Sequence, residues 1–90
     1  EVPVEYSLSQ NYPNPFNPVT KINFAIPKSG MVTIKLYDIL GREVSRLVNE
    51  YKAAGTYTLD FNAGNLSSGV YFYRMETSGF SDIKKMILLK

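Results

Sequence analysis

Seven short segments in which apolar and polar residues alternate follow one another along this 90-residue chain. Successive side chains of a strand point to opposite faces, so an alternation of period two predicts strands with one buried face. Turn residues (glycine, proline, asparagine and aspartate) separate the segments, a spacing typical of sandwiches and barrels. We therefore predict an all-β, antiparallel β-sandwich of about seven strands. The predicted strands cover residues 6–8, 21–26, 31–37, 43–49, 56–61, 70–77 and 83–89.

The segment after the turn at 38–41 fits two periods. Val44, Leu47, Val48 and Tyr51 follow the i, i+3, i+4, i+7 spacing of a helix. The stretch is short, however, and opens directly from a hairpin turn. We predict a strand over residues 43–49, with room for a bulge.

The composition limits the chemistry of the chain. Ninety residues form one domain, 1–90, in which residues 1–10 are expected to be a lead-in from an upstream domain. The absence of cysteine excludes disulfides, and the absence of histidine removes the commonest general base. A net charge of +2 is too balanced to indicate nucleic-acid binding. No apolar run approaches the ~20 residues that a transmembrane helix needs.

No constellation of residues typical of an enzyme is present. The eight acidic residues are scattered, the G-x-S-x-G motif is absent, and no glycine-rich loop is available for phosphate. Asp38 is best explained as a turn residue, because its side chain can bond to its own backbone two residues on. We predict a domain with no catalytic residue, metal, cofactor or small-molecule substrate.

Prolines and aromatic residues give two further expectations. Three prolines at 13, 15 and 18 fix φ in a segment that we predict to be a stiff, extended arm. The aromatic-rich run 70–77 suits a central strand with both faces covered. We expect Tyr57, Tyr71 and Tyr73 to fill the core with hydroxyls bonded at its rim, although tyrosines on a sheet face can also form a sugar-binding platform.

Four motifs occur in the order found in a known family. They are NYPNPFNP at 11–18 with TKINF at 20–24, YDILGREV at 37–44, LSSGVY at 66–71, and Gly79 followed by Lys84-Lys85. Together they resemble the type A C-terminal sorting domain of the type IX (Por) secretion system, over residues 8–90. They are also similar to the Ig-like domain of flagellar hook-capping proteins.

The resemblance implies an Ig-like sandwich that directs an exported cargo protein to the cell surface or the medium, through the periplasm and outer membrane. It implies an origin in the Bacteroidetes or Chlorobi-Ignavibacteria kind of bacterium. The implied partners are the outer-membrane translocon, a sortase-like peptidase, and an upstream cargo domain in the same chain. The residues that match the family's structural motif are Pro13, Asn14, Pro15, Asp38, Gly41, Gly55, Leu66, Gly69, Tyr71 and Gly79.

The last strand is the candidate recognition site. An apolar strand flanked by lysines offers an edge for pairing with a receptor strand. The residues assigned to recognition by the translocon are Lys84, Lys85, Met86, Ile87, Leu88 and Leu89. The same residues also fit an ordinary core strand with solvated lysines. Two other functions stay open: a retained Ig-like spacer or adhesion module, and a carbohydrate-binding module, of a multidomain secreted hydrolase.

Overall fold

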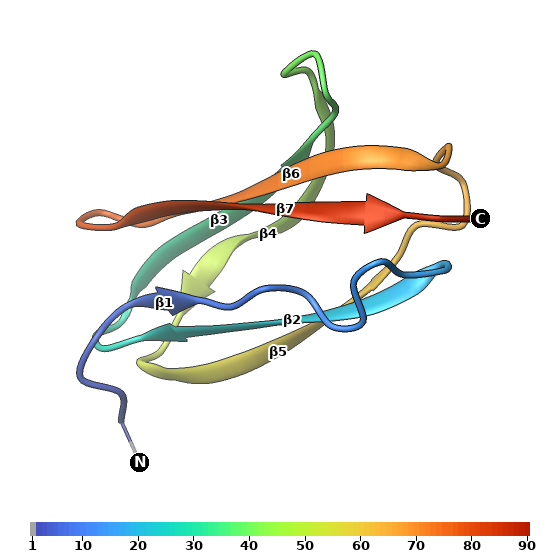
Figure 1. The fold of residues 1–90 in the computed structure, drawn as a ribbon. Helices are drawn as coiled ribbons and strands as arrows, with labels where there is room; N and C mark the ends of the chain where they lie inside the picture. The colour runs from blue at the N-terminus through green and yellow to red at the C-terminus, as the bar shows by residue number, and fades with distance from the viewer. Residues whose placement is uncertain (1) are drawn as a thin grey trace.

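The computed structural model describes residues 2–90, which form seven strands (Figure 1). No helix in this part of the chain is long and apolar enough to cross a membrane. The strands are β1 (Ser7–Leu8), β2 (Val19–Ile26), β3 (Gly30–Tyr37), β4 (Glu43–Lys52), β5 (Gly55–Asn62), β6 (Gly69–Glu76) and β7 (Ser81–Leu88).

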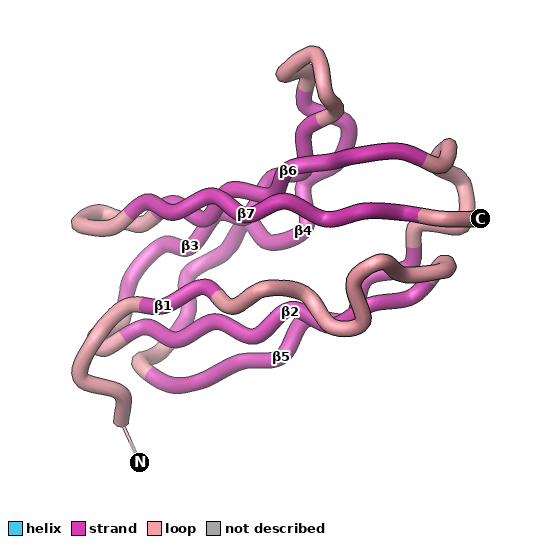
Figure 2. The backbone as a smooth tube through the Cα atoms, viewed as in Figure 1, coloured by secondary structure: helices cyan, strands magenta, loops and turns pink. Residues whose placement is uncertain are grey.

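The strands form two antiparallel sheets that face each other. One sheet has the order β1-β2-β5 and the other β4-β3-β6-β7. Figure 2 shows these strands as two layers joined by short loops. The grouping is that of an immunoglobulin sandwich whose fourth strand pairs with the third strand in the larger sheet. The prediction of a seven-stranded all-β sandwich is confirmed.

The segment with helical spacing is a bulged strand, as predicted. The register of β3 with β4 shifts between Ile34 and Lys35, where the partner changes from Val48 to Arg46. Leu47 is the extra residue, so that Leu47 and Val48 both contact the core although they are adjacent in the sequence. The bulge therefore explains why the apolar pattern of this strand departs from period two.

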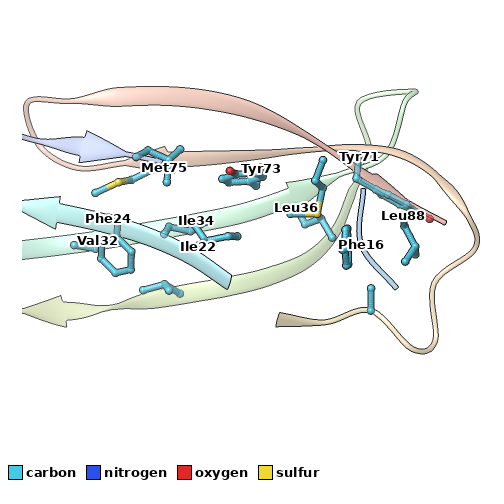
Figure 3. Close-up of a cluster of buried hydrophobic side chains, with 14 of the residues drawn as sticks. Phe16, Ile22, Phe24, Val32, Ile34, Leu36, Tyr71, Tyr73, Met75 and Leu88 are labelled. Atoms are coloured by element: carbon cyan, nitrogen blue, oxygen red, sulfur yellow. The ribbon is translucent and has the colours of Figure 1, made fainter. Parts of the chain in front are cut away.

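The core lies between the two sheets and follows the predicted alternation (Figure 3). Every second residue of β2, β3, β6 and β7 is buried where these strands overlap the opposite sheet. Burying apolar surface at about 25 cal/mol per Å² is the main force that holds the two layers together. The strand residues of the core include Ile22, Phe24, Ile26, Val32, Ile34, Leu36, Tyr71, Tyr73, Met75, Met86 and Leu88.

The tyrosines predicted to fill the core do so. Tyr71 and Tyr73 are buried and Tyr57 is half-buried against the core. Their hydroxyls donate to backbone carbonyl oxygens of Ser67 (2.7 Å), Ser9 (2.7 Å) and Ala53 (2.5 Å), respectively. A sugar-binding platform made of these three side chains is therefore wrong.

The expectation that β6 is covered on both faces is wrong. β6 does lie between β3 and β7, but only its inner face is buried. On the outer face Arg74 is exposed, and Val70 and Phe72 are half-buried. All seven strands of the described residues belong to the two sheets, and none of them packs on the outer face of β6.

The proline-rich arm, residues 10–18, connects the open sides of the two sheets. Tyr12 exchanges two backbone hydrogen bonds with Lys21 of β2, each 2.9 Å. Phe16 then pairs in parallel with Leu88 of β7, and its ring is buried in the core beside Leu36 (Figure 3). The predicted extended arm is wrong: the chain bends at 13–15 and 17–18, because it must cross from one sheet to the other while Phe16 turns inward.

Two buried polar side chains hold the bend of the arm. The Asn11 side-chain amide donates to Thr20 Oγ1 (3.0 Å) and to the carbonyl oxygen of Pro13 (3.1 Å). The Thr20 hydroxyl donates to that same carbonyl oxygen at 2.9 Å. Among residues 2–90 no buried side-chain nitrogen or oxygen lacks a hydrogen-bond partner. The network therefore carries no desolvation penalty and fixes one path for the arm.

Replacing Phe16 with alanine is expected to lower the free energy of unfolding by about 3 kcal/mol, because it leaves a cavity where the arm enters the core. Urea denaturation of the purified domain measures this loss. Tyr12→Ala is the matched control, since this aromatic residue of the same arm is 80% exposed and its loss is expected to cost under ~0.5 kcal/mol. Equal losses for the two variants would show that Phe16 does not anchor the arm.

Candidate recognition site

Strand β7 forms one edge of the four-stranded sheet, as the hypothesis about recognition requires. In the turn before β7, Thr77 N donates to Phe80 O at 2.9 Å. This bond sets which residues of β7 are hydrogen-bonded to β6, because bonded and non-bonded pairs alternate along an antiparallel ladder. Residues 82, 84, 86 and 88 therefore exchange backbone bonds with β6, and 81, 83, 85 and 87 direct theirs away from it. The second group forms the free edge of β7.

The six residues assigned to recognition do not form one surface. Met86 and Leu88 are fully buried in the core. Ile87 is half-buried, whereas Lys85 and Leu89 are exposed. The core residues cannot contact a receptor while the domain is folded, so the structure separates the lysines from the apolar end of the strand.

The arm covers the second half of the free edge. Phe16 N donates to Ile87 O (2.9 Å), and Leu89 N donates to Phe16 O (3.0 Å). The Ile87 amide also donates to Asn14 Oδ1 (2.9 Å), and the Gln10 side chain donates to Lys85 O (2.5 Å). The edge from Lys85 O to Leu89 is consequently closed by groups of the chain itself.

The first half of the edge is open. Within the described residues no strand is hydrogen-bonded to the outward-facing backbone of Ser81 and Ile83, although β1 of the smaller sheet contacts β7. The Ile83 amide has only a local acceptor, Asp82 Oδ1, at 2.9 Å. Ser81 and Ile83 were not predicted as site residues, although Ile83 is an aliphatic residue at a position that the alternation of β7 leaves exposed. The segment Ser81–Lys85 is therefore the part of β7 that can pair with another strand.

The turn between β3 and β4 is tightly hydrogen-bonded. Asp38 Oδ1 accepts from the amides of Leu40 (2.9 Å) and Arg42 (3.0 Å), and Asp38 Oδ2 pairs with Arg42 Nε at 2.9 Å. Gly41 has φ +84°, a left-handed conformation that glycine adopts without strain. The hydrogen bond from the Arg42 amide, with those from the Arg42 side chain and the Leu40 amide, holds the pKa of Asp38 below its ordinary value of 3.8. These contacts explain the motif residues Asp38 and Gly41 as structural.

The other motif residues lie at bends and strand ends. The carbonyl oxygen of Pro13 accepts the two hydrogen bonds of the buried Asn11–Thr20 network. The side-chain oxygen of Asn14 accepts a hydrogen bond from the Ile87 amide of β7. Leu66 packs against the core, and its amide donates to Ala63 O at 3.0 Å. Pro15 lies exposed beside Asn14, Gly55 and Gly69 begin β5 and β6, and Gly79 lies in the β6–β7 turn.

Tyr73 links Ser9, the residue before the arm, to the core. Its hydroxyl donates to the carbonyl oxygen of Ser9. Burial raises the pKa of this phenol to about 12, and the nearby Asp82 carboxylate adds to the rise. The neutral phenol is thus the form that the folded domain requires.

Comparisons with known proteins agree with the fold. Residues 10–89 match the model of the secretion system C-terminal sorting domain family. A solved structure of PorZ, an essential bacterial surface component of the type IX secretion system of Porphyromonas gingivalis, is similar in fold, with a TM-score of 0.58 and 20% identity. That match covers 94% of this chain and 11% of the PorZ chain. None of the curated proteins compared with the chain matches it.

The Asp38 turn is expected to make stability dependent on acid pH. A carboxyl group with a lowered pKa in the folded state stabilises the fold above its unfolded pKa, near 3.8, and this stability is lost as the pH falls through the folded pKa. The wild-type domain should exceed Asp38→Asn in melting temperature at pH 7, and the difference should shrink below pH 3.8. Asp60→Asn, which removes only the exposed pair with Lys21, is the control and should have little effect. A difference between wild type and Asp38→Asn that is independent of pH would contradict the role of the charge.

Tyr73 is expected to limit stability at alkaline pH. Because its folded pKa is raised, its contribution is complete below pH 10.0, the ordinary value, and is lost as the pH rises toward about 12. Tyr73→Phe keeps the ring but has no proton to lose. Urea denaturation between pH 8 and 12 should show wild type losing about 2 kcal/mol more than this variant. Wild type and variant share the other six tyrosines. Parallel curves of stability against pH would therefore refute the role assigned to the Tyr73 hydroxyl.

Proposed function

The chain belongs to the secretion system C-terminal sorting domain family, and we propose that the open segment of β7 is the part that the secretion machinery reads. As a member of this family the domain is a non-catalytic sorting signal that directs an attached cargo protein to be secreted. The system we infer is type IX, and the destination is the cell surface or the medium. The cargo is a domain upstream in the same chain.

The observation that carries the proposal is the half-open edge of β7. An edge strand presents unpaired amide and carbonyl groups, to which an extended segment of another protein adds as a further strand. In this domain the arm closes the edge from Lys85 O to Leu89, and the outward-facing backbone from Ser81 to the Lys85 amide is paired with no other strand. A strand of the outer-membrane translocon is the partner we infer for this free segment.

The two lysines and the apolar residues have different roles in this proposal. Lys85 faces outward on the open segment and meets the receptor directly. Lys84 lies on the inner face of the sheet at its rim, and its Nζ is 3.8 Å from Asp82 Oδ2. Met86 and Leu88 hold the strand in the core. The roles of Ile87 and Leu89 are to receive the arm through their backbone groups.

A sortase-like peptidase is the second partner that we infer, acting on the segment that precedes β1. Val2 and Val4 are exposed, which leaves this part of the chain accessible to an enzyme. Tyr6, which packs against the core and stacks on Phe80, marks where the folded sandwich begins. Mass spectrometry of the secreted cargo tests this step, and a mature protein that still carries residues 10–90 would exclude it.

Blocking the open edge with proline is expected to stop export. Ile83→Pro removes an amide that faces away from β6, so the ladder within the sheet is kept. The secreted fraction of a reporter fused to the domain should fall about tenfold in a type IX-secreting bacterium, the factor that corresponds to about 1.4 kcal/mol of lost binding. Ile83→Val keeps both the amide and an apolar side chain, and this control should be exported normally.

A melting curve of the purified variant separates a blocked edge from an unfolded domain. Where Ile83→Pro melts near wild type and is still exported, the proposal is refuted. If it does not fold, Ser81→Pro, at the first residue of the strand, takes its place. A truncation ending at Ile83 is less informative, since it also removes Met86 and Leu88 from the core.

A further inference from the structure

The outer face of the larger sheet carries a regular patch of apolar and basic side chains. The register places Tyr37, Phe72 and Lys85 in one row across β3, β6 and β7. Lys35, Arg74 and Ile83 form the next row. Side chains in neighbouring positions on one face of a sheet lie about 5 Å apart. We call these six residues the outer patch.

A groove lies where the outer patch meets the β3–β4 turn. Its volume is about 300 Å³, and its apolar lining comes from Tyr37, Ile39, Phe72 and Ile83. In Figure 1 this turn projects beyond the sandwich, on the side away from the N-terminus.

The tip of the turn holds two aliphatic side chains in solvent. Ile39 is 71% exposed and Leu40 is 73% exposed. Asp38 accepts hydrogen bonds from the Leu40 and Arg42 amides, which favour one conformation of the loop, and in this conformation both side chains are exposed. Exposed aliphatic residues on a rigid tip, next to an apolar groove, are typical of a contact surface with another protein.

The charges around the groove are mostly positive. The acidic side chains nearby are engaged, since Asp38 pairs with Arg42, Glu43 with Arg46, and Glu76 with Arg74. Lys35 and Lys85 make no salt bridge within residues 2–90. An occupant with carboxylates would therefore be favoured over a neutral or basic one.

The outer patch is continuous with the open edge of β7. Ile83 and Lys85 belong to both, because their side chains lie on the outer face while their backbone groups point to the free edge. A strand that pairs with the edge brings its own side chains next to the outer patch. A polyanionic sugar would match the lysines, but it would not bury Ile39, Leu40 and Ile83.

We propose that the outer patch and the tip of the β3–β4 turn bind an extended protein segment of the secretion machinery that carries aliphatic and acidic side chains. This inference rests on the proposed pairing of β7 with a receptor strand, and it assigns the side chains that give the pairing its specificity. The aliphatic side chains of the segment fill the groove below Ile39. Its carboxylates pair with Lys35 and Lys85.

The test measures export of the full cargo protein carrying the complete domain. Ile39→Ser with Leu40→Ser is expected to lower the secreted fraction at least about fivefold, which corresponds to about 1 kcal/mol at a binding site. Lys35→Glu with Lys85→Glu is expected to do the same, and Lys35→Arg with Lys85→Arg is expected to restore export. The matched controls are Tyr51→Ser, which is 69% exposed on β4 outside the outer patch, and Lys28→Glu, exposed in the β2–β3 loop. Melting curves should be unchanged, because every substituted residue is on the surface.

The outcomes separate this inference from the proposed function. Loss of export by Ile83→Pro together with normal export of both outer-patch variants would overturn the outer patch and leave edge pairing in place. Normal export of all three would overturn both. Two further measurements identify other occupants: co-sedimentation of the purified domain with lipopolysaccharide vesicles, and sedimentation equilibrium of the domain alone. Vesicle binding that depends on Ile39 and Leu40 would identify a lipopolysaccharide surface as the occupant, and dimer formation that depends on them would identify a second copy of the domain. Absence of both supports the protein segment.

Discussion

The crossing of the arm from β2 to β7 is the contact on which the rest of the structure depends. Phe16 enters the core between the sheets, and its backbone bonds to Ile87 and Leu89 on the last strand. Without this crossing, the apolar second half of β7 would present an unpaired edge. Such edges promote aggregation. The arm therefore protects the domain and also decides how much of β7 is left for a partner.

The arm covers only the second half of β7, so one half of this strand stabilises the fold and the other half is available for recognition. From Met86 onward the strand supplies core side chains, and its outer backbone groups are bonded to the arm. From Ser81 to the Lys85 amide the outer backbone is paired with no other strand, and the exposed Lys85 acts against edge-to-edge association with other copies. A receptor can pair with the free segment without displacing the arm. The binding energy is then not reduced by the cost of local unfolding.

The sequence predicted the fold because the strand faces are governed by local alternation. Ile22, Phe24 and Ile26 share one face whatever the neighbouring strands are, and the Asp38–Gly41 turn needs only its own residues. Even the bulged β4 could be predicted, because a hairpin turn leads into it. The family motifs were readable for the same reason.

The details of the site could not be predicted, since they depend on contacts between distant parts of the chain. Asn14 and Ile87 are 73 residues apart, and no local pattern says that their groups meet. The prediction that both faces of β6 are covered was wrong, because composition does not reveal which face of a sheet packs against a second sheet. Likewise, the outer patch becomes visible only when the register sets Lys35 beside Arg74 and Ile83. Only Ile83, exposed within an apolar strand, gave a signal that a closer reading of the alternation would have found.

Backbone pairing and the outer patch together suit a signal that serves as an attachable domain. Hydrogen bonds along a free edge do not depend on side-chain identity, so they tolerate sequence change in a fold that is kept at 20% identity in PorZ. Backbone pairing alone, however, does not distinguish one free edge from another. Side chains beside the edge must supply that distinction. In this domain the side chains in the right position are those of the outer patch and the rigid tip at Ile39 and Leu40, because the opposite face of β7 is packed into the core.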